Sequence, residues 1–361
     1  MPLVANSGLP GFQRLKDEGE EVLESGRAAT QNIRELHVGL LNMMPDAALE
    51  VTERQFMRLV GSCNRIAQFY IYPFTFPEIP RGDAAKAHIE NYYFDVDDLK
   101  KQGLDALIIT GAIPQNELNE EPFWEPLSEV LDWAAENVTS TLCACLATHA
   151  TMKYFWDLDR TQLSDKQWGV YPHRRTSDHP ITRNINSRFD VPHSRFNEIS
   201  RHAMEQKDIK VLIDSDEAGV HLATSPDGFR FVFFQGHPEY DQNSLLKEYK
   251  REVNRFVNGE RPDYPPYPAN YFNDRGRALL DQYQELLLAA EDPQQVLQSF
   301  PEGEALCGTE YTWGDTAKIV FSNWLGLVYQ TTGVSRFSPF MLGVDSADPL
   351  GLGQTESASD D

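Results

Sequence analysis

The sequence predicts an α/β protein with a mostly parallel, doubly wound sheet of the flavodoxin type and helices on both faces. Short apolar runs alternate with amphipathic segments of helical length, which is the pattern of β-α-β units. The apolar runs are continuous, as in strands that are buried on both faces. Several of them end in a glycine or a reactive side chain, and such groups gather at the carboxyl ends of parallel strands. A chain of 361 residues that is 41% hydrophobic is long enough for such a domain.

The first half of the chain carries the clearest alternation of elements. Its predicted strands are residues 36–44, 69–74, 105–110 and 139–144. Its predicted helices are residues 50–60, 124–137 and 146–156. The pattern then changes to shorter strands that predict a mixed extension of the sheet, at residues 168–171, 209–213, 219–223 and 229–234. The remaining predicted helices are residues 243–257, 275–291 and 316–330.

These elements divide the chain into four predicted regions. Residues 1–35 are polar and are interpreted as an N-terminal arm outside the core, with a short helix at 18–24. Residues 36–260 form the predicted catalytic domain, and residues 261–344 a C-terminal helical extension. Residues 345–361 contain five acidic residues and no basic one, which predicts a disordered tail.

The composition excludes several classes of partner. Lys and Arg total 32 and Asp and Glu total 55, so the net charge is −23, which argues against nucleic acid and anionic membranes. The simplest role of this charge is solubility, and a polyanionic substrate would need a local basic cluster. No apolar run approaches the roughly 20 residues that span a bilayer, and no secretory segment follows Met1, so we expect a cytoplasmic protein. Cys143 and Cys145 have no second cysteine pair for a zinc site, so no metal is expected.

A thiol and a His-x-Glu motif follow two of the predicted strands. Cys145 lies where the strand 139–144 turns into the helix 146–156, and a helix N-terminus offers N–H groups and a positive potential that favour a thiolate and an oxyanion. His237 and Glu239 follow the strand 229–234. These are the parts of a thiolate nucleophile, its base and a carboxylate that orients the base.

Each of these residues also has a simpler interpretation. A lone cysteine is more often a packing residue, and only the His-x-Glu motif at another strand end favours a nucleophile at Cys145. Cys143 lies inside the apolar strand and is assigned to packing. His149 lies one helical turn after Cys145, where a hydrogen-bonded structural histidine is the simpler interpretation.

The chain resembles a known family. Cys145 with Gly236-His237-Pro238-Glu239 resembles the Cys, His and Glu of class I glutamine amidotransferases. Further motifs in order resemble the MetA-type homoserine O-acyltransferases, the homoserine O-succinyltransferase family. They are Leu41-Asn42-x-Met44-Pro45, Gln55-Phe56-x-Arg58-Leu59, Ile109-Thr110-Gly111-Ala112, Gly169-Val170-Tyr171, Pro192-His193-Ser194-Arg195 and Asn323-Trp324-Leu325.

This resemblance implies an amidotransferase-like fold, a homodimer and a set of roles. Cys145 would carry an acyl-thioester, His237 would accept the proton and Glu239 would be its partner. Lys166, Ser194, Arg195, Glu248 and Arg251 would bind the small-molecule substrates, with Arg251 suited to an amino acid carboxylate and Glu248 to its ammonium group. The expected reaction is ping-pong transfer of an acyl group from an acyl-coenzyme A co-substrate to the homoserine hydroxyl, in methionine biosynthesis, with no bound cofactor.

The chain departs from the family pattern at several positions. The glycines that usually flank the nucleophile are replaced by Cys143 and Ala147, and residues 273–312 resemble an insertion. At the position that distinguishes acyl donors, the family has Gly for succinyl-CoA and Glu for acetyl-CoA, and Gln115 is the nearest match. We predict succinyl-CoA as donor. Acetyl transfer, serine as acceptor, a glutaminase-like hydrolase and a non-catalytic binding protein remain alternatives.

Overall fold

The computed structural model describes residues 3–63 and 67–354. Eleven strands form one sheet in the order β2-β1-β4-β3-β5-β6-β11-β10-β9-β7-β8. The first seven strands of this order are parallel to one another: β2 (Val22–Glu24), β1 (Leu3–Ala5), β4 (Ala67–Phe74), β3 (Arg34–Leu41), β5 (Ala106–Ile109), β6 (Ser140–Ala144) and β11 (Phe231–Phe234). The order β4-β3-β5-β6-β11 within them is the flavodoxin order, as predicted.

The other four strands extend the sheet in antiparallel fashion. They are β10 (Leu222–Thr224), β9 (Lys210–Asp214), β7 (Thr161–Arg175) and β8 (Arg188–Glu198). β7 and β8 form a long hairpin at the edge of the sheet, and β8 contains Pro192, which an edge strand tolerates. The predicted mixed extension is therefore confirmed, although β8 was not predicted.

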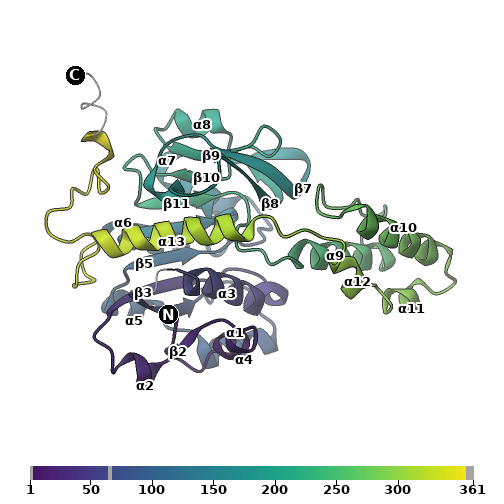
Figure 1. Ribbon diagram of the computed structural model, residues 1–361, viewed down its shortest axis with the longest axis horizontal. Coiled ribbons are helices and arrows are strands. Elements are labelled where there is room, and N and C mark those ends of the chain that lie inside the picture. Colours follow the sequence, from purple (N-terminus) through teal and green to yellow (C-terminus); the bar gives the residue numbers. More distant parts are fainter. Residues whose placement is uncertain (1–2, 64–66, 355–361) are drawn as a thin grey trace.

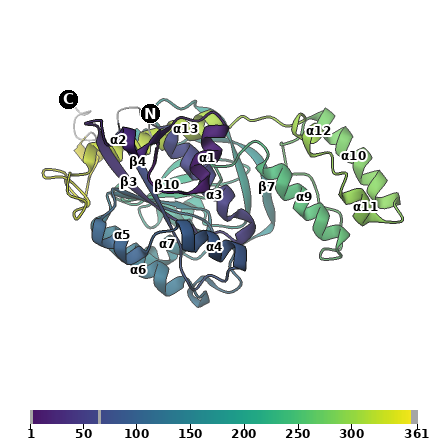
Figure 2. The same ribbon diagram turned by 90° about the horizontal axis from the view of Figure 1, so that it is seen from below.

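Helices cover both faces of the sheet (Figures 1 and 2). One face packs against α1 (Pro10–Asp17), α3 (Asp46–Gly61) and α13 (Gly314–Thr331). The other packs against α5 (Val96–Gln102), α6 (Trp124–Asn137), α7 (Leu146–Trp156) and α8 (Arg201–Glu205). The remaining α-helices of this part of the chain are α2 (Ser25–Ala28) and α4 (Asp83–Tyr92).

A helical lobe projects from one side of the molecule (Figure 2). It consists of α9 (Ser244–Val257), α10 (Asp274–Ala289), α11 (Pro293–Leu297) and α12 (Glu302–Leu306), and it has its own apolar cluster, which includes Trp168 of β7. At Gly169 the hairpin lies against the segment between α9 and α10, so closely that a Cβ there would be 2.3 Å from the carbonyl oxygen of Ala269. The segment that resembled an insertion thus forms much of an ordered lobe.

The two ends of the chain differ from the predictions. The N-terminal segment is not an arm outside the core, because β1 and β2 belong to the sheet and Leu3, Phe12 and Leu15 are buried. The predicted helix at 18–24 is wrong, since β2 occupies part of that range. The predicted helix at 316–330 is confirmed as α13, but it packs on the central sheet, where Trp324 donates to Ser140. In the predicted tail, residues 355–361 lie outside the described residues.

Within the described ranges, no helix is long and apolar enough to cross a membrane. The same residues contain no group of three or more His, Cys, Asp or Glu side chains that is arranged to hold a metal ion.

Candidate active site

Cys145 occupies a sharp turn between β6 and α7. Its backbone has φ 51° and ψ −111°, which is a strained conformation for a residue other than glycine. Its N–H donates to the carbonyl of Phe234 at 2.7 Å, and the hydroxyl of Thr148 bonds the carbonyls of Cys143 and Phe234 at 2.8 and 2.9 Å. Cys143 and Ala147, which replace the usual glycines, are fully buried and small. The turn thus holds the thiol at the carboxyl edge of the sheet.

His237 and Glu239 meet Cys145 at this edge. Nδ1 of His237 lies 2.7 Å from Oε1 of Glu239, and the imidazole also interacts with the Cys145 thiol. Burial alone would lower the pKa of His237, but the Glu239 carboxylate and Cys145 outweigh it and raise this pKa well above its usual value. Nε2 of His237 is buried and has no hydrogen-bond partner of ordinary geometry among the described residues. The arrangement supplies a proton acceptor beside a thiol.

The competing cysteine and histidine are held in other roles. The Cys143 thiol lies 3.3 Å from the hydroxyl of Thr151, and burial raises its pKa to about 12. Nε2 of His149 lies 3.0 Å from the side-chain oxygen of Gln235. Burial lowers the pKa of His149 to about 4, so its imidazole is neutral at physiological pH. Both placements agree with the structural interpretation.

Glu248 gathers four donors around one carboxylate beside His237. Its Oε2 accepts from the hydroxyl of Ser194 at 2.7 Å, the indole of Trp168 at 2.8 Å and the ammonium of Lys166 at 3.2 Å. Its Oε1 accepts from the hydroxyl of Tyr240 at 2.6 Å. Burial acts to raise the pKa of Glu248, but the charge of Lys166, the hydroxyls of Tyr240 and Ser194 and the charge of His237 outweigh it and hold this pKa below its usual value. Oε2 is therefore fully occupied, and only Oε1, with its single donor, keeps an acceptor position for a substrate ammonium.

Sequence reasoning missed Tyr240 and Trp168. The ring of Tyr240 stacks on His237, while Trp168 supports the ammonium of Lys166 at 4.4 Å from its ring centre. Tyr240 follows directly after the Gly-His-Pro-Glu motif, and this adjacency is the signal that would have found it.

The two predicted arginines are placed very differently. Arg251 is exposed on α9, forms no hydrogen bond or ion pair with any described residue, and acts electrostatically on Lys166. Arg195 is buried, and its guanidinium donates to the carbonyls of Asn197 and Ala218 at 2.8 and 2.5 Å. Its direct role in substrate binding is therefore not supported, because its donors are already paired within the protein.

The side chain of Gln115 has no hydrogen bond to any described residue. The side chain is exposed, whereas the backbone N–H groups of Gln115 and Asn116 both donate to Oε1 of the buried Glu121 at 2.5 Å. Gly111, at the start of this loop, lies close to the nucleophile: an added Cβ there would be 3.5 Å from Cβ of Cys145. The predicted specificity role of Gln115 therefore lacks a contact.

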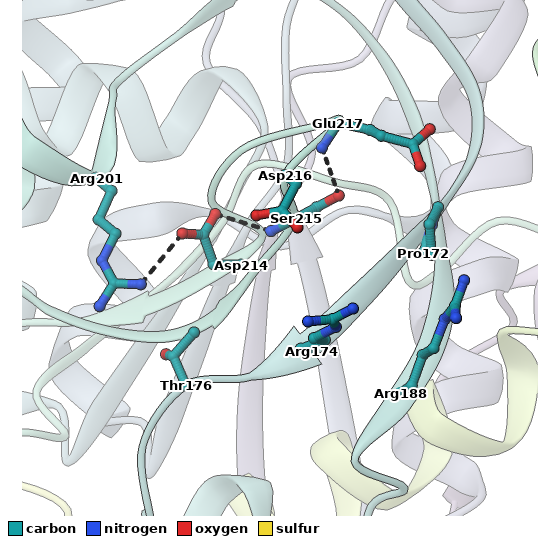
Figure 3. A pocket seen from close by; sticks show the side chains of 9 residues that line it. All are labelled: Pro172, Arg174, Thr176, Arg188, Arg201, Asp214, Ser215, Asp216 and Glu217. Atoms are coloured by element: carbon teal, nitrogen blue, oxygen red, sulfur yellow. Dashed lines mark hydrogen bonds and ion pairs between the residues drawn. The ribbon is translucent and has the colours of Figure 1, made fainter.

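A separate cavity of about 180 Å³ lies among β7, β8 and β9 (Figure 3). Three arginines and three carboxylates line it, so its formal charges balance, and Asp214 is paired with Arg201. None of its lining residues is a predicted site residue. Two strands, β10 and β11, separate β9 from β6, the strand that Cys145 follows. This cavity is therefore not part of the candidate active site.

A family model described as homoserine O-succinyltransferase matches residues 2–334. The chain belongs to this family. A homoserine O-succinyltransferase of Methylobacter tundripaludum is 58% identical over 98% of this chain and all of its own length. Proteins of the same name from Methylococcus capsulatus and Thiobacillus denitrificans are 55% and 54% identical, again over 98% of this chain and their full length. The predicted family membership is confirmed.

Solved structures of glutamine amidotransferases are also similar to this homoserine O-succinyltransferase family member. One from Thermotoga maritima is 12% identical, with a TM-score of 0.41, and covers 83% of this chain and all of its own. Another from Methylobacillus flagellatus is 10% identical, with a TM-score of 0.43, over 82% of this chain and 95% of its own.

Proposed function

We propose that this protein transfers the succinyl group of succinyl-coenzyme A to the hydroxyl of L-homoserine, through a thioester on Cys145. The observation that carries the proposal is the convergence of Cys145, His237 and Glu239 beside the carboxylate cluster of Glu248. The names of the relatives, at more than half identity over almost the whole chain, support the same substrates.

In the first half-reaction, the Cys145 thiolate attacks the thioester carbonyl of the donor. The tetrahedral intermediate collapses as its bond to the coenzyme A sulfur breaks, and the His237 imidazolium gives its proton to the leaving thiolate. One thioester replaces another, so the step is near neutral in energy. The first N–H groups of α7, which have no acceptors within the helix, adjoin the developing oxyanion.

In the second half-reaction, the homoserine hydroxyl gives its proton to Nε2 of His237 and attacks the acyl-enzyme. The bond between the acyl carbon and the Cys145 sulfur then breaks, which releases the ester and restores the thiolate and imidazolium pair. Glu239 holds Nδ1 of the ring through the 2.7 Å contact, so Nε2 is the nitrogen that exchanges the proton.

The acceptor is proposed to bind between Lys166, Ser194 and Arg251. The two cations suit its carboxylate, because Arg251 is exposed and unpaired with any described residue and Lys166 is held in place by Glu248. Glu248 then orients Lys166 and Ser194. This role takes the place of the direct contact with the substrate ammonium that the sequence predicts.

The test is release of free thiol from succinyl-CoA and acetyl-CoA, each with homoserine or serine. We expect thiol release to be fastest with succinyl-CoA and homoserine. A strong preference for acetyl-CoA would overturn the donor, and a preference for serine would overturn the acceptor. Acyl-CoA consumption that leaves no acylated amino acid would instead indicate a hydrolase.

A further inference from the structure

Three buried histidines that the proposed chemistry does not use lie directly behind the Gly236-His237 segment. They are His173 on β7, His193 on β8 and His221 just before β10, and all are less than 4% exposed. Burial is the main cause that lowers the pKa of each of these histidines. The pKa of His173 falls to about 4 and those of His193 and His221 fall well below their usual value, so all three rings are neutral at physiological pH.

One chain of hydrogen bonds fixes the protons of two of these rings. Arg195 Nε donates to Nδ1 of His193 at 3.2 Å. A guanidinium only donates, so Nδ1 of His193 carries no proton and its Nε2 must carry one. That Nε2 lies 3.2 Å from Nε2 of His173, which therefore accepts. The remaining proton of His173 is on Nδ1, which lies 2.9 Å from the carbonyl oxygen of Tyr171. Donors and acceptors match at every link.

The ring of His193, in the middle of this chain, packs against Gly236 together with the ring of His221. A Cβ at Gly236 would lie 2.8 Å from Nε2 of His193, Nδ1 of His221 and Cγ1 of Val191, so the two imidazoles and this valine occupy the space of a side chain there. The next residue, His237, donates its backbone N–H to the carbonyl of Pro192 at 2.8 Å, and Pro192 is the neighbour of His193 on β8. The backbone before the proposed base is therefore held by one short stretch of strand.

Arg195 anchors the other end of the chain. Besides His193, it binds the carbonyls of Asn197 and Ala218 and forms an ion pair with Glu198 at 3.6 Å. Its charge also interacts with Cys145. Because these acceptors hold the buried guanidinium in place, its hydrogen bond to His193 also has a fixed direction.

We propose that His193, held between Arg195 and His173, is a positioning residue for His237: it fixes the backbone of Gly236 and so directs the imidazole of His237 at Cys145. This role extends the proposed acyl transfer and rests on it. His193 itself touches no reacting atom, and its effect on the reaction passes through Gly236.

The test compares His193→Phe with His193→Gln and with a matched control, His179→Phe. Phenylalanine fills the space but breaks both hydrogen bonds, whereas glutamine can accept from Arg195 and donate to His173. His179 is another buried neutral histidine with two backbone partners, Gly228 and Ile181, and it is not among the three side chains nearest to a Cβ at Gly236. The absorbance of the Cys145 thiolate is followed as a function of pH, with Cys145→Ser as the baseline. The rate constants of both half-reactions are measured separately.

We expect His193→Phe to slow both half-reactions by about ten- to a hundred-fold and to shift the thiolate titration, with the Michaelis constants nearly unchanged. His193→Gln should recover most of the rate, and His179→Phe should lower thermal stability with wild-type rates in the folded protein. If His193→Phe does not fold, His173→Phe removes the next link and should show the same pattern. The proposal would be overturned if folded His193→Phe had the rates and the thiolate titration of the wild type. It would also be overturned if His179→Phe lost as much rate as His193→Phe. The titration needs no substrate, so a wrong substrate assignment would leave its result unaffected.

Discussion

The ring of Tyr240 stacks on the imidazole of His237, with ring centres 4.4 Å apart and planes 20° apart. The hydroxyl of the same tyrosine donates to Glu248, which in turn holds Lys166 and Ser194. Tyr240 therefore connects the proposed base with the proposed acceptor site, so a substitution at one of them should alter the other.

Tyr240→Phe keeps the stacked ring and removes the hydroxyl. A hydrogen bond to a charged group contributes about 1.5–3 kcal/mol, although Glu248 retains three other donors. We expect the Michaelis constant for homoserine to rise by roughly ten-fold, with acyl-enzyme formation nearly unchanged. Steady-state and single-turnover kinetics measure the two effects. Tyr267→Phe, which loses a hydroxyl bonded to Asp281 in the lobe, is the control and should behave as wild type.

Arg251→Lys keeps the positive charge but loses the planar fork that grips a carboxylate. We expect a Michaelis constant for homoserine raised by roughly ten-fold and a normal rate of acyl-enzyme formation, because the acceptor is absent from that half-reaction. Arg255→Lys on the same helix, where Arg255 pairs with Glu252 and Glu260, is the control. Slower acylation with normal acceptor kinetics would instead place Arg251 in the donor site.

Glu121, rather than Gln115, is expected to control the loop beside the thiol. Glu121→Ala leaves two backbone N–H groups without their shared acceptor, so we expect a lower melting temperature and a raised Michaelis constant for the acyl donor. Gln115→Gly, at an exposed side chain, should change the rate of neither donor, and Glu120→Ala is the surface control. A switch of donor preference in Gln115→Gly would show that the side chain turns inward when the donor binds.

The buried neutral histidines should make folding sensitive to acid. Burial lowers the pKa of His149, His173 and His179 from 6.5 to about 4. Between pH 6.5 and about 4 the unfolded chain binds more protons than the folded chain. The contribution of these histidines to the free energy of unfolding is therefore fully present above pH 6.5 and is lost as the pH drops toward 4. Each histidine contributes about 1.4 kcal/mol per pH unit in this window. Urea midpoints across the window should fall less steeply in His179→Gln, and an unchanged slope would contradict the assignment.

The sequence predicted the elements that follow from local pattern. Cys145 and His237 were found because strand ends of a parallel sheet meet at one edge, and the helix that begins at Leu146 was predicted to the residue. β1 was missed because three residues are too few to show a period. β8 was missed because Pro192 and several charged residues interrupt its pattern.

Which side chains meet at the site, and which way each one faces, was beyond sequence reasoning. The four donors around Glu248 of α9 come from β7, β8 and the segment after β11, and no local pattern links them to this helix. Arg195 belongs to a family motif, but only the fold shows that its guanidinium faces the interior. Gln115 was aligned by position alone, and the loop turns its side chain to solvent.

The most direct test of the account is mass spectrometry of the protein after mixing with succinyl-CoA in the absence of homoserine. Fragmentation of the peptide that holds both Cys143 and Cys145 separates the two thiols. The account predicts one succinyl adduct, on Cys145, which disappears when homoserine is added and never forms in Cys145→Ala. An adduct on Cys143, or full turnover by Cys145→Ala, would contradict it.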